Sequence, residues 1–180
     1  KEAKRVIWQR ADEEESLFAG EAVRTAADSE AKISFVSGPQ IEMDPESVVV
    51  IEEAGDKINL DFVKGNLFFK GGDTKGQSQL ALKSGNTSIS LANADMALNK
   101  DASGKNLDVQ VLRGTAELNQ NGKSVTLDRD KSGLVNEKGI DVKTQFLKIK
   151  APVAFAKIFL RMDKREPLVI EWENLPENFD

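Results

Sequence analysis

Short alternations of apolar and polar residues run through most of this 180-residue chain. From residue 31 onward, apolar side chains fall at every second position in successive segments, for example in residues 58–62, 89–91 and 107–111. Period-two alternation is typical of a half-buried strand, because successive side chains point to opposite faces. Clusters of Gly, Pro, Asn and Asp break these segments roughly every 8–12 residues. The pattern therefore predicts an all-β fold made of many short strands.

Two of the breaks make definite predictions. Asn121 and Gly122 separate the apolar positions Leu118 and Val125. Asn-Gly is a strong signal for a two-residue hairpin, because both central positions of that turn need a positive φ. The Lys-Gly-Asn sequence at 64–66 follows an alternating segment and predicts another turn between strands.

The C-terminal part of the chain is compatible with two secondary structures. In a helix, one face of residues 153–162 would carry Phe155, Ile158, Phe159 and Met162. We favour strands, because residues 168–172 alternate and a partner strand at about 156–162 would complete a hairpin. The tail therefore predicts a C-terminal β-hairpin extension, with a helix at 153–162 as the alternative.

A boundary between two units is predicted near residues 143–152. The charge changes sign there, and Ala151-Pro152 interrupts the alternation. We expect a β domain in residues 1–142. Residues 143–180 would then form a C-terminal β extension or the start of a second β-sandwich module.

The composition excludes most enzyme chemistry. The chain contains no Cys, no His and no Tyr. It therefore lacks a thiol nucleophile, the usual general base at neutral pH and the commonest transition-metal ligand. A pair of carboxylates could still hydrolyse a glycoside, but nothing marks any of the 30 acidic residues as buried or paired. We expect a protein that is not an enzyme and needs no cofactor.

The charge is distributed unevenly along the chain. The formal net charge is −5, which disfavours nucleic acid as a partner. Residues 143–166 contain seven basic and two acidic residues, so this segment carries +5 and the remainder carries −10. The residues predicted to bind an anionic partner are Lys148, Lys150, Lys157 and Arg161. Alternatively, lysines in this segment protect the edge of a sheet against pairing with another sheet.

Two predicted turns have part of the pattern of calcium loops. Residues 99–104 and 128–133 place oxygen-bearing side chains at alternate positions before a glycine. A calcium loop of this type needs a bidentate Glu at its twelfth position, where these two segments have Gln110 and Gly139. Ordinary turns use the same Asp, Asn, Ser and Gly residues. We therefore expect plain turns and no metal site.

The two tryptophans of the chain are expected in the core. Trp172 shares one face of its predicted strand with Leu168 and Ile170. Trp8 follows two apolar residues and would close the start of the sheet. Large aromatic side chains of this kind bury more apolar surface than any others.

An ordered series of motifs in residues 8–142 resembles the FecR domain, which is named for the sensor-regulator of bacterial iron-citrate uptake. Residues 17–25 read Leu-Phe-Ala-Gly-Glu-Ala-Val-Arg-Thr, similar to the opening motif L-x-x-G-(D/E)-x-(V/I)-x-T of the family. The other matching segments, in chain order, are residues 29–35, 38–50, 110–116 and 125–127. Residues 91–98 depart from the family pattern, which usually has Gly-Thr-x-Phe there.

The resemblance implies a fold and a class of function. The fold would be a FecR-like β-roll or a β-solenoid-like sandwich. The function would be periplasmic signal transmission or scaffolding through binding of an envelope protein. No anti-sigma segment or C-terminal signalling module is recognisable, so the resemblance does not extend to iron signalling itself. The alternative is a carbohydrate- or peptidoglycan-binding structural module, with a cell-wall glycan as partner.

The resemblance also implies export to the periplasm or cell surface. No run of about 18 apolar residues is present to span a bilayer. Because the chain begins with Lys1, we expect that a targeting or anchoring segment preceded it. Contact with a membrane would occur only through that missing N-terminal segment.

Overall fold

The computed structural model describes residues 8–53, 57–71, 79–129, 131–144, 149–151 and 170–172. These residues contain strands and no helix, and therefore no helix that could cross a membrane. The prediction of an all-β protein is confirmed. Eleven strands form one sheet, and the short strands β12 (Ile149–Ala151) and β13 (Glu171–Trp172) form a second. The proposed helix or strand at 153–162 lies outside the described residues.

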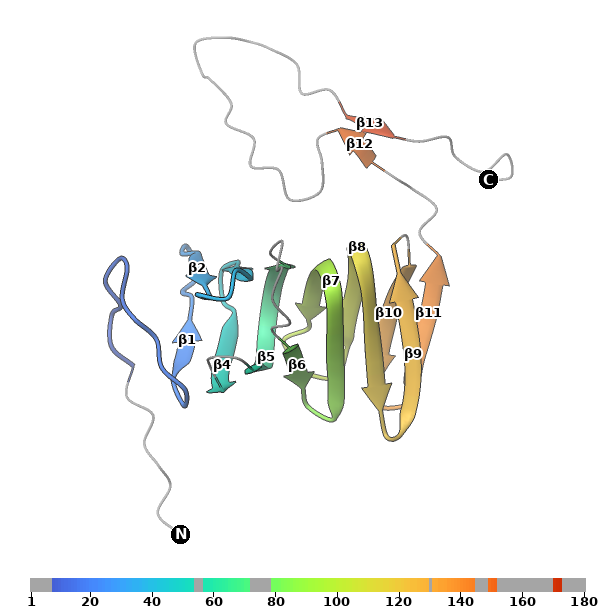
Figure 1. Cartoon of the computed structure of the whole chain (residues 1–180), viewed down its shortest axis with the longest axis horizontal. Helices are drawn as coiled ribbons and strands as arrows, with labels where there is room; N and C mark the ends of the chain where they lie inside the picture. Colours follow the sequence, from blue (N-terminus) through green and yellow to red (C-terminus); the bar gives the residue numbers. More distant parts are fainter. Residues whose placement is uncertain are drawn as a thin grey trace.

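The large sheet combines short strands with three long ones (Figure 1). In chain order, its strands are β1 (Ala22–Arg24), β2 (Ala31–Ser34), β3 (Gln40–Met43), β4 (Val48–Glu53), β5 (Lys57–Lys70), β6 (Gln79–Ser84), β7 (Thr87–Lys100), β8 (Leu107–Gln120), β9 (Lys123–Asp128), β10 (Lys131–Asn136) and β11 (Gly139–Thr144). Strands β5, β7 and β8 have 14 residues each. The centre of the sheet is thus built from longer strands than the sequence pattern predicts.

Each long strand runs through two layers of the sheet. In the first layer, the start of β5 pairs with β4 and β6, and the end of β8 pairs with β7 and β9. In the second layer, the end of β5 pairs with β3 and β7, and the start of β8 pairs with β7 and β10. Strands β1 and β2 lie at one end of these layers, and β9 and β11 lie at the other (Figure 1).

The long strands change which of their positions are buried as they pass from one layer to the other. In β5, the buried side chains lie at even positions up to Phe62 and at odd positions afterwards. The change is centred on Gly65 in β5 and on Gly114 in β8, both of which have a positive φ. In β7 it falls at the register shift between Ala92 and Asp95. One extra residue bends each strand and keeps its apolar side chains toward the core, as in a β-bulge.

The core lies between the two layers. Its largest buried side chains come from both, with Phe62 in the first layer and Phe69 in the second. The layers pack so closely that a Cβ atom on Gly133 of β10 would lie 3.0 Å from Leu127 Cδ1 of β9. It would also lie 3.2 Å from Leu118 Cδ2 of β8. Glycine at 133 therefore leaves room for apolar side chains of the opposite layer.

Residues of the FecR-like motifs fix the first corner of the sheet. The Thr25 hydroxyl donates to the Asp44 carbonyl at 2.6 Å and accepts from Ser47 N at 2.9 Å. The Ser47 hydroxyl donates to the Asn66 carbonyl at 2.9 Å and accepts from Asn66 N at 3.0 Å. Thr25 and Ser47 are both buried. The two hydroxyls thus satisfy the backbone on each side of the bend at Gly65.

The two turn predictions have opposite outcomes. The hairpin at Asn121 and Gly122 is confirmed, with φ values of 52° and 78°, and it joins β8 to β9. The predicted turn at 64–66 is wrong, because these residues lie inside β5 and Gly65 bends the strand without ending it. The division of the chain near residue 142 stays a prediction.

Candidate functional site

At one end of the large sheet lie two strands that each pair with a single described strand. Within the part of the chain that the structure describes, β9 pairs only with β8 and β11 pairs only with β10. Both lie at the same end of the sheet, on the right in Figure 1. A strand edge carries backbone N–H and C=O groups that can accept another strand. We call β9 and β11 together the open end.

Apolar side chains reach the surface at the open end. On β10 and β11, Val135 pairs with Ile140 and Gly133 pairs with Val142. Since Val135 and Gly133 are buried, Ile140 and Val142 also point to the inner side of the second layer. Val142 is nevertheless 40% exposed, because no described strand of the first layer covers it. The open end thus exposes part of the core-facing surface beside two strand edges that no other described strand covers.

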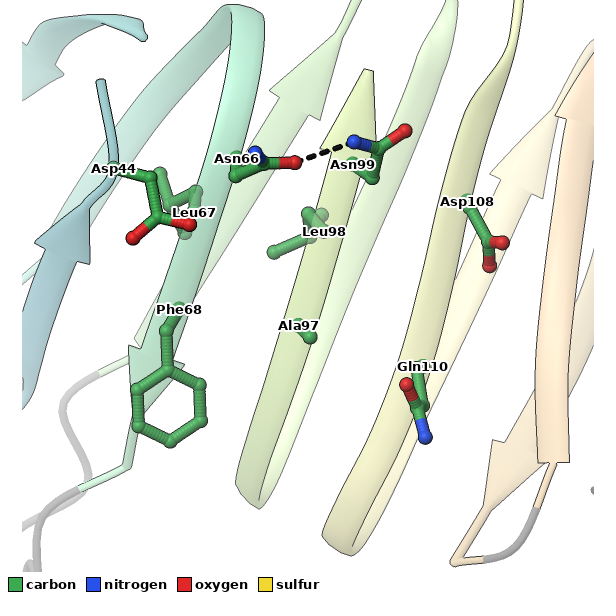
Figure 2. Close-up of a pocket in the computed structure, with 9 residues that line it drawn as sticks. All are labelled: Asp44, Asn66, Leu67, Phe68, Ala97, Leu98, Asn99, Asp108 and Gln110. Atoms are coloured by element: carbon green, nitrogen blue, oxygen red, sulfur yellow. Dashed lines mark hydrogen bonds between the residues drawn. The ribbon is translucent and has the colours of Figure 1, made fainter. Parts of the chain in front are cut away.

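The second candidate site is an open groove of about 340 Å³ on the outer side of the second layer (Figure 2). Its lining residues are Asp44, Asn66, Leu67, Phe68, Ala97, Leu98, Asn99, Asp108 and Gln110. Phe68, Ala97 and Gln110 stand in one row across β5, β7 and β8. Because these positions alternate with buried ones, their side chains face away from the core.

A second row of polar residues borders the groove. Asn99 Nδ2 donates a hydrogen bond to Asn66 Oδ1 (Figure 2). Burial raises the pKa of the neighbouring Asp108 above its usual value, and the positive charge of Lys143 on β11 partly opposes this effect. Amide and carboxylate groups beside an aromatic ring can hydrogen-bond a polar ligand while the ring packs on its apolar part. The groove therefore suits binding of a polar ligand.

An ion pair fixes the bend of β7 and β8. Arg113 Nε lies 2.9 Å from Asp95 Oδ2, and Arg113 Nη2 donates to the Gly71 carbonyl at 2.8 Å. The Gly71 N–H donates to Asp95 Oδ1 at 3.0 Å. A Cβ atom on Gly71 would lie 2.7 Å from the carbonyl oxygen of Ala94. Asp95 and Arg113 thus bind the backbone as well as each other, which is a structural role.

The turn at 99–104 is filled by its own hydrogen bonds. The Asp101 carboxylate accepts bonds from Ser103 Oγ at 2.8 Å, Lys105 N at 3.0 Å and Asn106 Nδ2 at 2.6 Å. The bond from Ser103 is the largest of the effects that lower the pKa of Asp101. Across the described ranges, no three or more acidic residues are grouped so that they could hold a metal ion. In the turn at 128–133, Asp130 lies outside those ranges.

The basic residues predicted to bind a partner are largely outside the described structure. This applies to Lys148, Lys157 and Arg161. Lys150 lies in β12, but its side chain is not among those described. Their role in binding stays a prediction.

The expectation that Trp8 lies in the core is wrong. Its side chain is 46% exposed, and the guanidinium carbon of Arg24 lies 6.0 Å from the centre of its ring. Trp8 precedes the first strand, so no sheet pairing directs it inward; it makes a cation–π contact at the surface instead. The backbone of Trp172 belongs to β13, but its side chain is not described.

Sequence reasoning missed both the open end and the groove. One signal for the groove was readable, because adjacent Phe68 and Phe69 in a strand must point to opposite faces. Phe69 is buried and Phe68 faces outward. The open end depends on which strands become neighbours across the two layers, and period-two alternation does not encode that order.

Comparisons with known proteins give one family and a similar fold among solved structures. The family model described as FecR protein matches residues 21–117. Two crystal structures of a candidate anti-sigma factor from Parabacteroides distasonis have a similar fold, with TM-scores of 0.61 and 0.60 at 15% and 14% identity. Each similarity covers 69% of this chain and 60% of the other, so the matched region spans less than two thirds of those proteins. No curated protein matches the chain.

Proposed function

This chain belongs to the FecR protein family, and from that premise we propose that it is a non-catalytic regulatory domain that transmits signals by binding a protein in the bacterial cell envelope. The name of the solved relatives, a candidate anti-sigma factor, supports a regulatory role. The absence of Cys and His from the sequence supports a function without catalysis. We place the domain in the periplasm or at the cell surface, as the family resemblance implies.

The observation that carries this proposal is the open end. It combines two strand edges, β9 and β11, with the partly exposed inner side chain of Val142. Backbone groups at a free edge give affinity for an extended segment, and side chains beside it give specificity. Proteins usually cover such edges or blunt them with charge, because they otherwise pair with other chains. An edge with adjoining apolar surface therefore favours a protein partner.

The experiment is site-specific photo-crosslinking in envelope extract. A benzoylphenylalanine is placed at Thr144, an exposed position of β11, or at Ser90, an exposed position of β7 on the outer face of the first layer. We expect one crosslinked envelope protein from position 144 and none from position 90. The absence of a specific crosslink at both positions, with retention of the chain on purified peptidoglycan sacculi, would overturn the proposal.

A second candidate function, glycan binding, is favoured by the groove around Phe68. An aromatic ring flanked by the amides of Asn99 and Gln110 and by Asp108 has the chemistry of a sugar site. This function predicts that the chain is retained on sacculi and that Phe68→Ala releases it. The matched control is Phe18→Ala, because Phe18 is a surface phenylalanine that lies outside the groove. Equal release by both variants would contradict a glycan site in the groove.

We also propose the finer features of the architecture. The bent long strands support a FecR-like β-roll for the N-terminal part of the chain. The charge reversal after residue 142 supports a separate C-terminal β module. Limited proteolysis tests this division, which predicts cleavage between residues 143 and 152 with the large sheet left intact.

A further inference from the structure

The two layers do not end level at the open end. Leu127 of β9 packs over Gly133 of β10, at 3.0 Å from the position that a Cβ atom would take. Gly133 in turn pairs with Val142 of β11. The second layer, which ends in β11, therefore reaches about one strand width further than the first layer, which ends in β9. A further strand beside β9 would lie about 4.8 Å from it and would cover the inner side of β11.

We propose that the open end binds one extended segment of a partner protein, which pairs antiparallel with β9 and covers Val142. This proposal rests on the proposed function, since it specifies how that protein partner is held. The segment would add a strand to the first layer, so that both layers end level. Its inward side chains would complete the core, and its backbone would occupy the edge of β9 that no described strand covers.

The inward side chains of β9 determine what the partner strand must carry. Lys123, Val125 and Leu127 pair with buried residues of β8, so all three lie on the inner side of the sheet, with Lys123 exposed at the hairpin end of β9. In an antiparallel partner, the residues beside Leu127 and Val125 would be apolar, and the residue beside Lys123 would be acidic. The expected sequence is therefore apolar-x-apolar-x-acidic, read from the N-terminus of the partner segment.

Lys123 provides specificity at this edge. An inward-pointing charge on an edge strand opposes pairing with an arbitrary apolar strand, which would bury the charge without a partner. An acidic residue at the matching position removes that penalty. The charge complementarity thus favours a segment with an acidic residue beside Lys123 over non-specific association with apolar strands.

The test uses the whole chain and three capped synthetic peptides of seven residues. The first, Thr-Val-Thr-Val-Thr-Glu-Thr, has the expected pattern. The second replaces Glu with Lys, and the third, Val-Val-Thr-Thr-Thr-Glu-Thr, has the composition of the first without its alternation. Amide hydrogen exchange locates binding, and an NMR titration measures affinity. We expect the first peptide to protect residues 123–128 and to bind roughly fivefold more tightly than the Lys peptide, with no protection by the third.

Two matched pairs of variants assign the binding to the open end. Val142→Asp should weaken binding roughly tenfold or more, whereas Val63→Asp should not, although Val63 is equally exposed at 41%. Lys123→Glu should reverse the preference between the Glu and Lys peptides. Lys32→Glu, an exposed position on β2, should leave that preference unchanged.

Several results would overturn the strand site. The first is that no peptide protects the amides of residues 123–128 from hydrogen exchange. The second is that Val142→Asp and Val63→Asp weaken peptide binding equally. The third is that these amides are fully protected in the chain without peptide at every protein concentration. The last result would mean that the chain's own residues occupy the edge. Self-association dispersed by Val142→Asp, without peptide binding, would mean that a second copy occupies it.

The two proposals fail separately. An envelope protein that still crosslinks at position 144 in the Val142→Asp variant would leave protein binding in place and overturn the strand site. Peptide binding at residues 123–128 without any crosslinked envelope protein would support the strand site and count against the proposed envelope function.

Discussion

The bend of β5 depends on a glycine at position 65, and its replacement by alanine tests how the corner is built. Gly65 has φ +97°, a conformation that costs a residue with a Cβ atom about 1–2 kcal/mol. A Cβ atom there would also lie 2.3 Å from Ser47 Oγ and 2.5 Å from Ser47 Cα. The Cα atom belongs to the backbone, so the strand itself would have to move.

The cost can be estimated from the bonds that such a movement breaks. The Ser47 hydroxyl makes two hydrogen bonds with the backbone of Asn66, at 2.9 and 3.0 Å. Each is worth about 1 kcal/mol when the partners lose it. Together with the backbone strain, Gly65→Ala should lower the free energy of unfolding by about 3–4 kcal/mol. That is a large share of the stability of an ordinary domain.

Urea unfolding measured by circular dichroism checks this estimate, with Gly85→Ala as the control. Gly85 also has a positive φ, +62°, but nothing lies within 4 Å of its Cβ position. The control should therefore lose only the conformational cost of about 1–2 kcal/mol. Equal losses for the two variants would refute the conclusion that contact with Ser47 requires glycine at 65.

Three further changes test other parts of the fold. Thr25→Val should lower the free energy of unfolding by about 2–3 kcal/mol, because it leaves the buried Ser47 N–H without its acceptor; urea unfolding should show a smaller loss for Thr25→Ser, which keeps the hydroxyl. Gly133→Ala should cost about 1–3 kcal/mol through crowding against Leu127, and a change within 0.5 kcal/mol would contradict close packing of the layers. Partial burial raises the pKa of Asp108, so its charged form destabilises the fold, and the stability falls as the pH rises through the folded-state pKa. Asp108→Asn should therefore raise stability at pH 7, and this gain should disappear below pH 3.8, the pKa of an unperturbed aspartate; a gain that persists at pH 2.5 would exclude this cause.

The sequence was sufficient to predict the strands but not their lengths. In β5 the apolar positions run through Ile58, Leu60 and Phe62 and resume at Leu67. A change from even to odd positions is produced equally by a turn between two strands and by a bulge inside one. Gly65 supplies a positive φ in either case. The distinction depends on pairing with β3 and β7, which bond to the second half of β5 and carry it into the other layer.

The candidate sites were harder to predict than the strands, because they depend on long-range neighbours. The groove brings together residues from β5, β7 and β8, whose rows are set by the pairing of those three strands. In the sequence, Val142 occupies an ordinary inward position of an alternating strand. It is exposed only because no described strand lies opposite β11. The prediction that Trp8 is buried failed for a related reason, because apolar neighbours in the sequence predict burial only where a strand forms.

The FecR-like motif residues explain how the sheet is bent, but they do not explain which partner the protein binds. The motif residues Thr25 and Ser47 meet Gly65, which lies outside the motifs, at one corner, where hydroxyls and a positive φ hold the backbone. These residues hold the corner whichever partner the protein binds. Partner choice must then depend on residues that the corner does not constrain, such as Lys123 and Val142 at the open end. This is why Lys123→Glu should change which peptide binds without changing the fold, whereas Gly65→Ala should change the stability of the fold itself.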